Sequence, residues 1–254
     1  VTSCLVVALL VVGIVGASLA YFTDKDKADN TFTVGKVKIQ LNEQQRNADG
    51  TALEAFEQNK ALNPIVGSAQ GEKDEFGMPT AKNYVDKMVT VTNTGSKDAY
   101  IRAYFAIPSA LDDGEESFNA GLNVLHFNFG NKVKDGTVTT TYENEWFWKT
   151  AGKWNYFETT IDGIAYNVYY ADYATAVPAG QTTEQFVQGV YLDKSFDIKD
   201  DGAYAFGKKL ELDAGWDWSK VTCPVFAVAV QADGFDNAAQ AMDAAFGADY
   251  NPWK

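Results

Sequence analysis

The sequence predicts an all-β fold, an antiparallel β-sandwich or barrel with loop and helix insertions and a short C-terminal helix. Three observations predict it. Apolar and polar residues alternate in many short segments, turn residues separate these segments at intervals of about 8–12 residues, and helical periodicity is confined to one stretch near the end. Strands that alternated with long helical segments would instead predict a parallel sheet.

The first 20 residues predict a segment separate from the folded domain. Residues 1–20 carry no charge and end in Ser18-Leu19-Ala20, with small residues where signal peptidase cleaves. We expect a secretory signal cut after Ala20 by signal peptidase during export, and hence a secreted, cell-surface protein. The alternative is a retained hydrophobic segment, since about 20 apolar residues span a bilayer. Residues 21–35 follow as a charged segment that also carries Tyr21, Phe22, Phe32 and Val34.

Residues 36–254 are expected to form one sandwich domain. Val37, Ile39 and Leu41 alternate with polar residues and predict its first strand, and a strand, a turn at Asn93-Thr94-Gly95 and a second strand are predicted within 89–107. Insertions are expected near 42–83, with a short helix over 52–60, and near 109–170. Further strands are predicted at 122–129, 137–142, 146–149, 154–159, 164–170, 184–192 and 225–232.

The end of the chain has the spacing of an amphipathic helix. Apolar residues recur at positions i, i+3, i+4, i+7 and i+8, namely Ala238, Ala241, Met242, Ala245 and Phe246. We expect Asp236 to cap the start of this helix and Gly247 to end it.

Charge and cysteine content restrict the partners and the means of stabilisation. A formal charge of −13 argues against nucleic acid as a partner, because phosphate binding needs a basic face. Of the two cysteines, Cys4 lies in the predicted signal, so Cys223 has no partner for an intramolecular disulfide. Its apolar neighbours predict a buried, inert thiol.

The sequence gives no catalytic motif, and we predict that the protein is not an enzyme. A zinc site of the His-Glu-x-x-His type needs two histidines, and the chain has only His126, which we expect to be structural. A Cys223–His126 pair, a carboxylate-only metal site and a carboxylate pair of the glycosidase type stay open on sequence alone.

No cofactor is predicted, with Ca²⁺ as the alternative. Two groups of oxygen ligands lack the spacing of a calcium-binding EF-hand loop and are interpreted as solvated acidic turns: Asp24, Asp26, Asp29 and Asn30, and Asp197, Asp200 and Asp201.

An aromatic cluster marks the predicted hairpin around Ala151-Gly152. Alternation places Trp146 and Trp148 on one face, with Trp154 on the returning strand. We interpret the three tryptophans as core or subunit interface. The alternative is a stacking platform for the sugar rings of a matrix polysaccharide.

Several blocks of the sequence resemble the TasA and camelysin proteins of bacteria, which include fibre subunits of the biofilm matrix and use a dedicated type of signal peptide. The resemblance covers about a third of the chain, in the same order. Its blocks are Gly16–Asp24, Asn30–Val37, Val91–Gly95 with Tyr100–Arg102, Val177–Thr183 and Ala229–Phe235.

The resemblance implies a jelly-roll sandwich whose N-terminal segment leaves its own subunit and pairs with a sheet edge of the next. Tyr21, Phe22, Phe32 and Val34 would then belong to a donor strand, and the partner would be further copies of the chain in extracellular fibres, or pili. Two alternatives stay open: a monomeric surface module that binds glycans, and a metallopeptidase of camelysin type.

Overall fold

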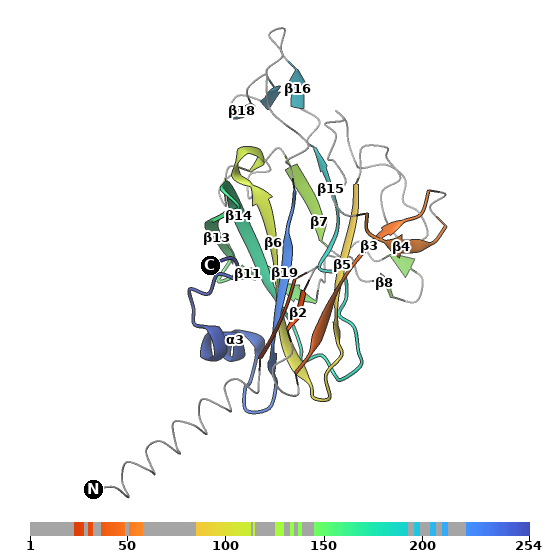
Figure 1. Ribbon diagram of the computed structural model, residues 1–254, viewed down its shortest axis with the longest axis vertical. Coiled ribbons are helices and arrows are strands. Elements are labelled where there is room, and N and C mark those ends of the chain that lie inside the picture. The colour runs from red at the N-terminus through yellow and green to blue at the C-terminus, as the bar shows by residue number, and fades with distance from the viewer. Residues whose placement is uncertain are drawn as a thin grey trace, which may run out of the picture.

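The protein is described by a computed structural model in which two antiparallel sheets pack as a β-sandwich (Figure 1). The structure describes residues 23–27, 30–32, 37–48, 51–57, 85–112, 114, 125–129, 133–134, 137–138, 145–192, 196–198, 204–206, 210–212 and 222–254. The predicted all-β sandwich is confirmed.

The first sheet has the order β10-β14-β6-β19-β1-β2, and β13 also pairs with β14. Its strands are β1 (Thr23–Lys27), β2 (Asn30–Phe32), β6 (Ala99–Pro108), β10 (Trp146–Phe147), β13 (Tyr156–Ile161), β14 (Ile164–Tyr173) and β19 (Val225–Gln231).

The second sheet has the order β4-β3-β5-β15-β7. Its strands are β3 (Ile39–Arg46), β4 (Leu53–Ala55), β5 (Val85–Asn93), β7 (Leu125–Phe129) and β15 (Val187–Leu192). Short hairpins add β8 (Val133–Lys134) with β9 (Thr137–Val138), β11 (Lys149–Thr150) with β12 (Lys153–Trp154), and β16 (Phe196–Ile198), β17 (Tyr204–Phe206) and β18 (Leu210–Leu212).

The chain passes repeatedly between the two sheets, which gives the sandwich its jelly-roll-like character. Among the principal strands β1, β3, β5, β6, β7, β14, β15 and β19, the step from β3 to β5 stays within one sheet, and every other step crosses to the opposite sheet. Neighbours in each sheet are therefore mostly distant in sequence. For example, β19 lies between β6 and β1.

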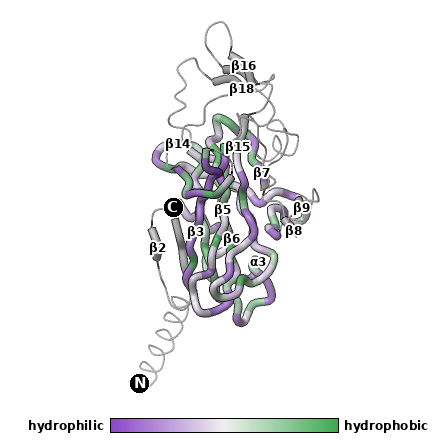
Figure 2. Tube along the Cα trace, turned by 90° about the vertical axis from the view of Figure 1, so that its right-hand side faces the viewer, coloured by the Kyte–Doolittle hydropathy of each residue, from purple (hydrophilic) through white to green (hydrophobic). Residues whose placement is uncertain are grey.

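Alternation of side chains along the strands builds the core between the sheets. In β3, Ile39 and Leu41 are buried, whereas Gln40 between them is exposed. Figure 2 shows that hydrophilic and hydrophobic residues are interspersed along the strands of the sandwich. Strands of both sheets contribute to this interior, including Val89, Val91, Ile101, Phe105, Val187 and Ala227.

A second apolar cluster covers the outer face of the first sheet. It contains Tyr104, Phe226 and Val228 from the strands, together with Ala241 and Met242 of helix α3 (Ala238–Phe246). The C-terminal residues also pack there, with the Trp253 ring 5.9 Å from that of Phe226. Strands β6 and β19 are therefore buried on both faces, which explains why every residue of each is buried.

The predicted C-terminal helix is confirmed, with Gly247 at its end at a φ of 85°. The predicted cap was wrong by one residue. Asn237 caps the helix, because its side-chain oxygen accepts a hydrogen bond from the Gln240 backbone N–H at 2.9 Å.

The short helix predicted at 52–60 was also wrong where the structure describes it. Leu53–Ala55 forms β4 and pairs with Gln44, Gln45 and Arg46 of β3. Tertiary pairing overrides the weak helical preference of this segment. Residues 58–83 of the expected insertion lie outside the described residues.

The range 109–170 is not wholly an excursion from the sandwich. It contains β7 and most of β14, and β14 pairs with β6 over seven register positions, from Tyr166 opposite Pro108 to Asp172 opposite Arg102. The alternation at 122–129 and 164–170 predicts these strands.

Candidate assembly site

The N-terminal segment pairs with the edge of β19 in its own subunit. The register places Thr23 opposite Val230, Asp24 opposite Ala229 and Lys27 opposite Phe226. Strand β2 then pairs with β1 on the other side, with Phe32 opposite Lys25. Among the expected donor residues, Phe32 lies in β2, while Tyr21, Phe22 and Val34 lie outside the described residues.

The direction of the backbone groups of β19 follows from its hydrogen bonds to β6. Ala106 N–H donates to the Pro224 carbonyl at 3.0 Å, and Ala232 N–H donates to the Asp98 carbonyl at 2.9 Å. Even-numbered residues of β19 thus bond to β6. Because antiparallel pairing alternates sides, the N–H and C=O groups of Ala227 and Ala229 point toward β1.

The two faces of β19 have different neighbours. Val225, Ala227 and Ala229 belong to the cluster between the sheets, whereas Phe226, Val228 and Val230 belong to the cluster under α3. All six are at most 6% exposed. A strand this deeply buried needs hydrogen-bonding partners along both edges, because an unpaired buried backbone group costs about 1–3 kcal/mol.

The strand at 225–232 was predicted from the sequence, but it was not identified as the strand that pairs with the N-terminal segment. The available signal was the absence of polar alternation in Val225-Phe226-Ala227-Val228-Ala229-Val230. Such a continuous apolar run predicts a strand covered on both faces.

A buried ion pair lies in β3 and β5 of the second sheet. Lys87 Nζ is 3.2 Å from Glu43 Oε1, and both side chains are at most 10% exposed. The Lys87 ammonium also lies 4.6 Å from the centre of the Phe56 ring. Buried charges need such partners, so the pair and the aromatic face compensate for the loss of water.

Cys223, just before β19, is buried as expected. Burial raises the pKa of its thiol to about 12, and the nearby Lys87 charge only partly opposes this effect. The thiol is therefore neutral at physiological pH and has little nucleophilic character. His126 lies in β7 opposite Tyr191 and is half-buried.

A second ion pair fixes β14 against β6 beneath the outer cluster. Arg102 donates from Nε to Asp172 Oδ1 at 2.6 Å and from Nη2 to Oδ2 at 2.9 Å. Burial alone would lower the pKa of Arg102, but the hydrogen bond and charge of Asp172 outweigh it and raise the pKa. The Arg102 guanidinium also lies 4.9 Å from the centre of the Tyr170 ring.

The tryptophan cluster lies mainly in the core. Trp146 and Trp148 are 2% and 6% exposed, and the Trp148 ring stacks on Phe186 at 4.4 Å between ring centres. Trp146 Nε1 donates to the Glu184 carbonyl at 3.1 Å. Neither ring presents a face to a sugar in this structure. Trp154 is half-buried, with the Lys149 ammonium 4.7 Å from its ring centre.

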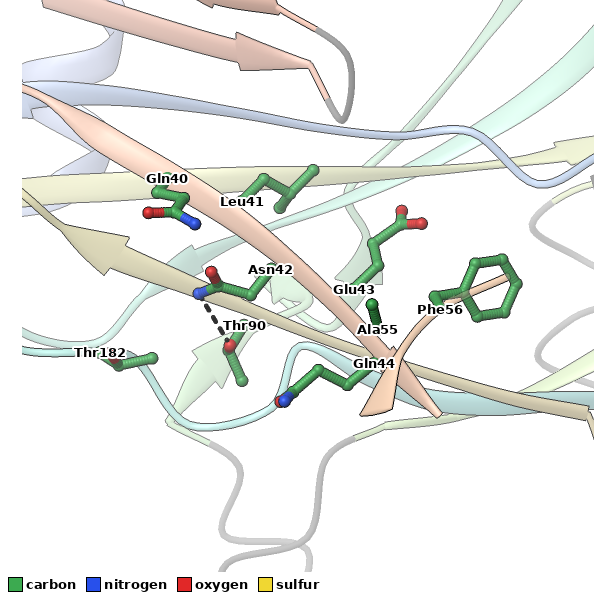
Figure 3. A pocket seen from close by; sticks show the side chains of 9 residues that line it. All are labelled: Gln40, Leu41, Asn42, Glu43, Gln44, Ala55, Phe56, Thr90 and Thr182. Atoms are coloured by element: carbon green, nitrogen blue, oxygen red, sulfur yellow. Dashed lines mark hydrogen bonds between the residues drawn. The ribbon is translucent and has the colours of Figure 1, made fainter. Parts of the chain in front are cut away.

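A shallow groove of about 600 Å³ lies beside β3 (Figure 3). Gln40, Asn42 and Gln44 extend from one side of this strand, and Thr90 and Thr182 complete that side. Asn42 Nδ2 donates to Thr92 Oγ1 at 2.9 Å, and the Thr92 and Thr182 hydroxyls are 2.8 Å apart. Part of this polar surface is thus engaged in bonds among its own side chains.

In the described part of the chain, no group of three or more His, Cys, Asp or Glu side chains is arranged to hold a metal ion. Asp24, Asp26 and Asn30 lie in β1 and β2 and Asp197 in β16, while Asp29, Asp200 and Asp201 lie outside the described residues. Within the same part, no helix has the length and apolar character needed to cross a membrane.

Comparison of the chain with protein-family models, with curated proteins and with solved structures finds no match in any of the three. The resemblance to the TasA and camelysin proteins therefore stays a prediction from the sequence blocks.

Proposed function

We propose that this protein is a secreted structural subunit that polymerises into extracellular fibres by exchanging its N-terminal strand between copies. The observation that carries the proposal is the pairing of β1 with β19. The edge of a buried strand is completed by a segment that precedes the rest of the sandwich in the sequence, and only residues 33–36 separate β2 from Val37.

Exchange would preserve the contacts that the subunit already makes. If β1 of a second copy paired with β19, the N–H and C=O groups of Ala227 and Ala229 would have the same kind of partner. The donor segment and the β19 edge are different surfaces, so the contact is heterologous and repeats from copy to copy as a filament. Each copy both donates and accepts one segment.

The sequence of β1 gives a reason for exchange. Within one subunit, the charged residues Asp24, Lys25 and Asp26 occupy the positions opposite Ala229, Val228 and Ala227. A strand that pairs with a buried apolar strand normally has apolar residues at every second position, as Phe32 and Val34 are placed. The charged residues of β1 therefore make its pairing within one subunit weak, so that the segment can leave its own β19 and pair in the same register with β19 of another copy, where Phe32 and Val34 are available for contacts with the acceptor subunit.

Electron microscopy of two proteins tests the proposal. Protein that begins at Tyr21 should form fibres, and protein that begins at Lys36, without β1 and β2, should not. A synthetic peptide of residues 21–35 added to the shorter protein should restore its thermal stability by closing the β19 edge, which separates loss of assembly from loss of folding. Monomers from both proteins across salt, pH and concentration would instead favour the glycan-binding module.

A further inference from the structure

The edge of the first sheet opposite to β2 also has the features of an interface. Strand β13 pairs with β14 in a hairpin whose turn contains Asp162 and Gly163, with φ angles of 50° and 84°. Two successive residues with a left-handed backbone conformation are typical of a hairpin with a two-residue turn. In such a hairpin the flanking residues, Ile161 and Ile164, form backbone hydrogen bonds with each other. Tyr170 N–H donates to the Asn155 carbonyl at 3.1 Å, in agreement with this alternation.

The outward backbone groups of β13 follow from that alternation. Phe157, Thr159 and Ile161 bond to β14, so the N–H and C=O groups of Glu158 and Thr160 point away from the sheet. Among the strands that the structure describes, β14 is the one that pairs with β13. Figure 1 shows β13 at the margin of the molecule beside β14.

Within the described residues, this edge lacks most features that prevent pairing with another chain. The strand Tyr156-Phe157-Glu158-Thr159-Thr160-Ile161 contains no proline and no lysine, and its pairing with β14 is regular. Proline, lysine and bulges are the usual means by which edge strands avoid association. One acidic residue, Glu158, is present, and it restricts the register that a partner strand can adopt.

We propose that two copies of this chain pair through β13, antiparallel across a twofold axis at Thr159. In that register Glu158 of one copy lies opposite Thr160 of the other, and their outward backbone groups form hydrogen bonds. A shift of this register by two residues in one direction places Glu158 opposite Glu158 of the second copy. A shift by two residues in the other direction places Glu158 opposite Asp162 of the second copy. Like charges directly opposite are unfavourable, so the register centred on Thr159 is selected.

The side chains next to the edge suit the same register. Phe157 lies opposite Ile161 of the second copy, and the reverse pair repeats across the axis. Both residues are half-buried and pack at the margin of the apolar cluster under α3, as does Ile164. Pairing therefore buries two partly exposed groups of apolar side chains against each other, in addition to forming backbone hydrogen bonds. The contact does not need exchange of β1, and within fibres it would link neighbouring filaments laterally.

Cysteine cross-linking tests this pairing. The two copies of Thr159 form a non-hydrogen-bonded pair, whose Cα atoms in antiparallel sheets are about 4.5 Å apart, close enough for a disulfide. Thr159→Cys protein that begins at Tyr21 should form a covalent dimer on mild oxidation about tenfold faster than Thr160→Cys protein, which is the matched control. Cys223 is buried and does not interfere.

The rates are read at concentrations where electron microscopy shows no fibres, so failure of strand exchange leaves this result unchanged. Thr160→Pro, which removes an outward N–H while leaving the β14 side intact, should slow dimer formation in the Thr159→Cys background. Equal rates for the two cysteine variants, or faster dimer formation by Thr160→Cys, would overturn the proposal. Circular dichroism confirms that each variant is folded.

Discussion

Ala229 of β19 is the register partner of Asp24 of β1, so a buried core strand of the sandwich depends on the N-terminal segment for its second edge. The backbone groups of Ala227 and Ala229 bond to β1 because those of the even-numbered residues bond to β6. This dependence gives the first prediction.

Protein that begins at Lys36 should be less stable than protein that begins at Tyr21. Each buried backbone group of Ala227 and Ala229 left without a partner costs about 1–3 kcal/mol, so the expected loss is several kcal/mol. Urea unfolding of the two proteins at low concentration measures it. Equal midpoints would mean that β1 contributes nothing to the closed subunit.

The Arg102–Asp172 pair should be strongly coupled. Asp172→Leu leaves the Arg102 charge buried without its bidentate partner, and the expected loss of stability is about 3–5 kcal/mol. The double variant Arg102→Met, Asp172→Leu removes both charges and should be nearer to the original protein. A double-mutant cycle by chemical unfolding checks both values. Additive losses would show that the pair contributes no coupling.

Trp148→Ala should destabilise the fold rather than remove a ligand contact. The ring is buried and stacked on Phe186, and truncating a large core aromatic costs about 3–5 kcal/mol. Thermal unfolding followed by circular dichroism measures the loss, with Phe147→Ala as control because Phe147 is 58% exposed. Unchanged stability together with lost glycan binding would support the sugar platform instead.

Alkaline pH should destabilise the protein partly through Cys223. The folded-state pKa is raised to about 12 from a value of 9.0. The contribution of the buried, neutral Cys223 thiol to stability is fully present below pH 9. It falls as the thiol of the unfolded chain ionises, and it is lost as pH approaches 12. At about pH 10.5 the thiol should account for a loss of about 1–2 kcal/mol.

Comparison with Cys223→Ala isolates this effect from that of the buried Tyr104 and the half-buried Tyr170, whose pKa values burial also raises. The difference in stability between the original protein and the variant should shrink between about pH 8 and about pH 10.5. A difference that does not change with pH would show that the thiol ionises equally in both states.

The strands and the closing helix could be predicted because local sequence determines them. Alternation at Val37, Ile39 and Leu41 depends only on which face of a strand is buried, and the spacing of Ala238, Ala241 and Met242 only on helical geometry. The pairing of β19 with β1 could not be predicted, because it joins segments about 200 residues apart and depends on the whole sheet order. The helix expected at 52–60 failed for a related reason, since pairing with β3 decides the conformation of Leu53–Ala55.

Disulfide mapping of the β1–β19 pair in assembled protein tests strand exchange most directly. Lys25 and Val228 are register partners, and alternation makes them a non-hydrogen-bonded pair suited to a disulfide. If a donor β1 keeps this register, a mixture of Lys25→Cys protein and Val228→Cys protein, assembled under reducing conditions and then oxidised, should give covalent heterodimers on non-reducing gels. The double variant should give a ladder of multimers. Fibres in which the double variant yields only intramolecular disulfides, and the mixture no heterodimers, would show that β1 stays in its own subunit and would contradict exchange.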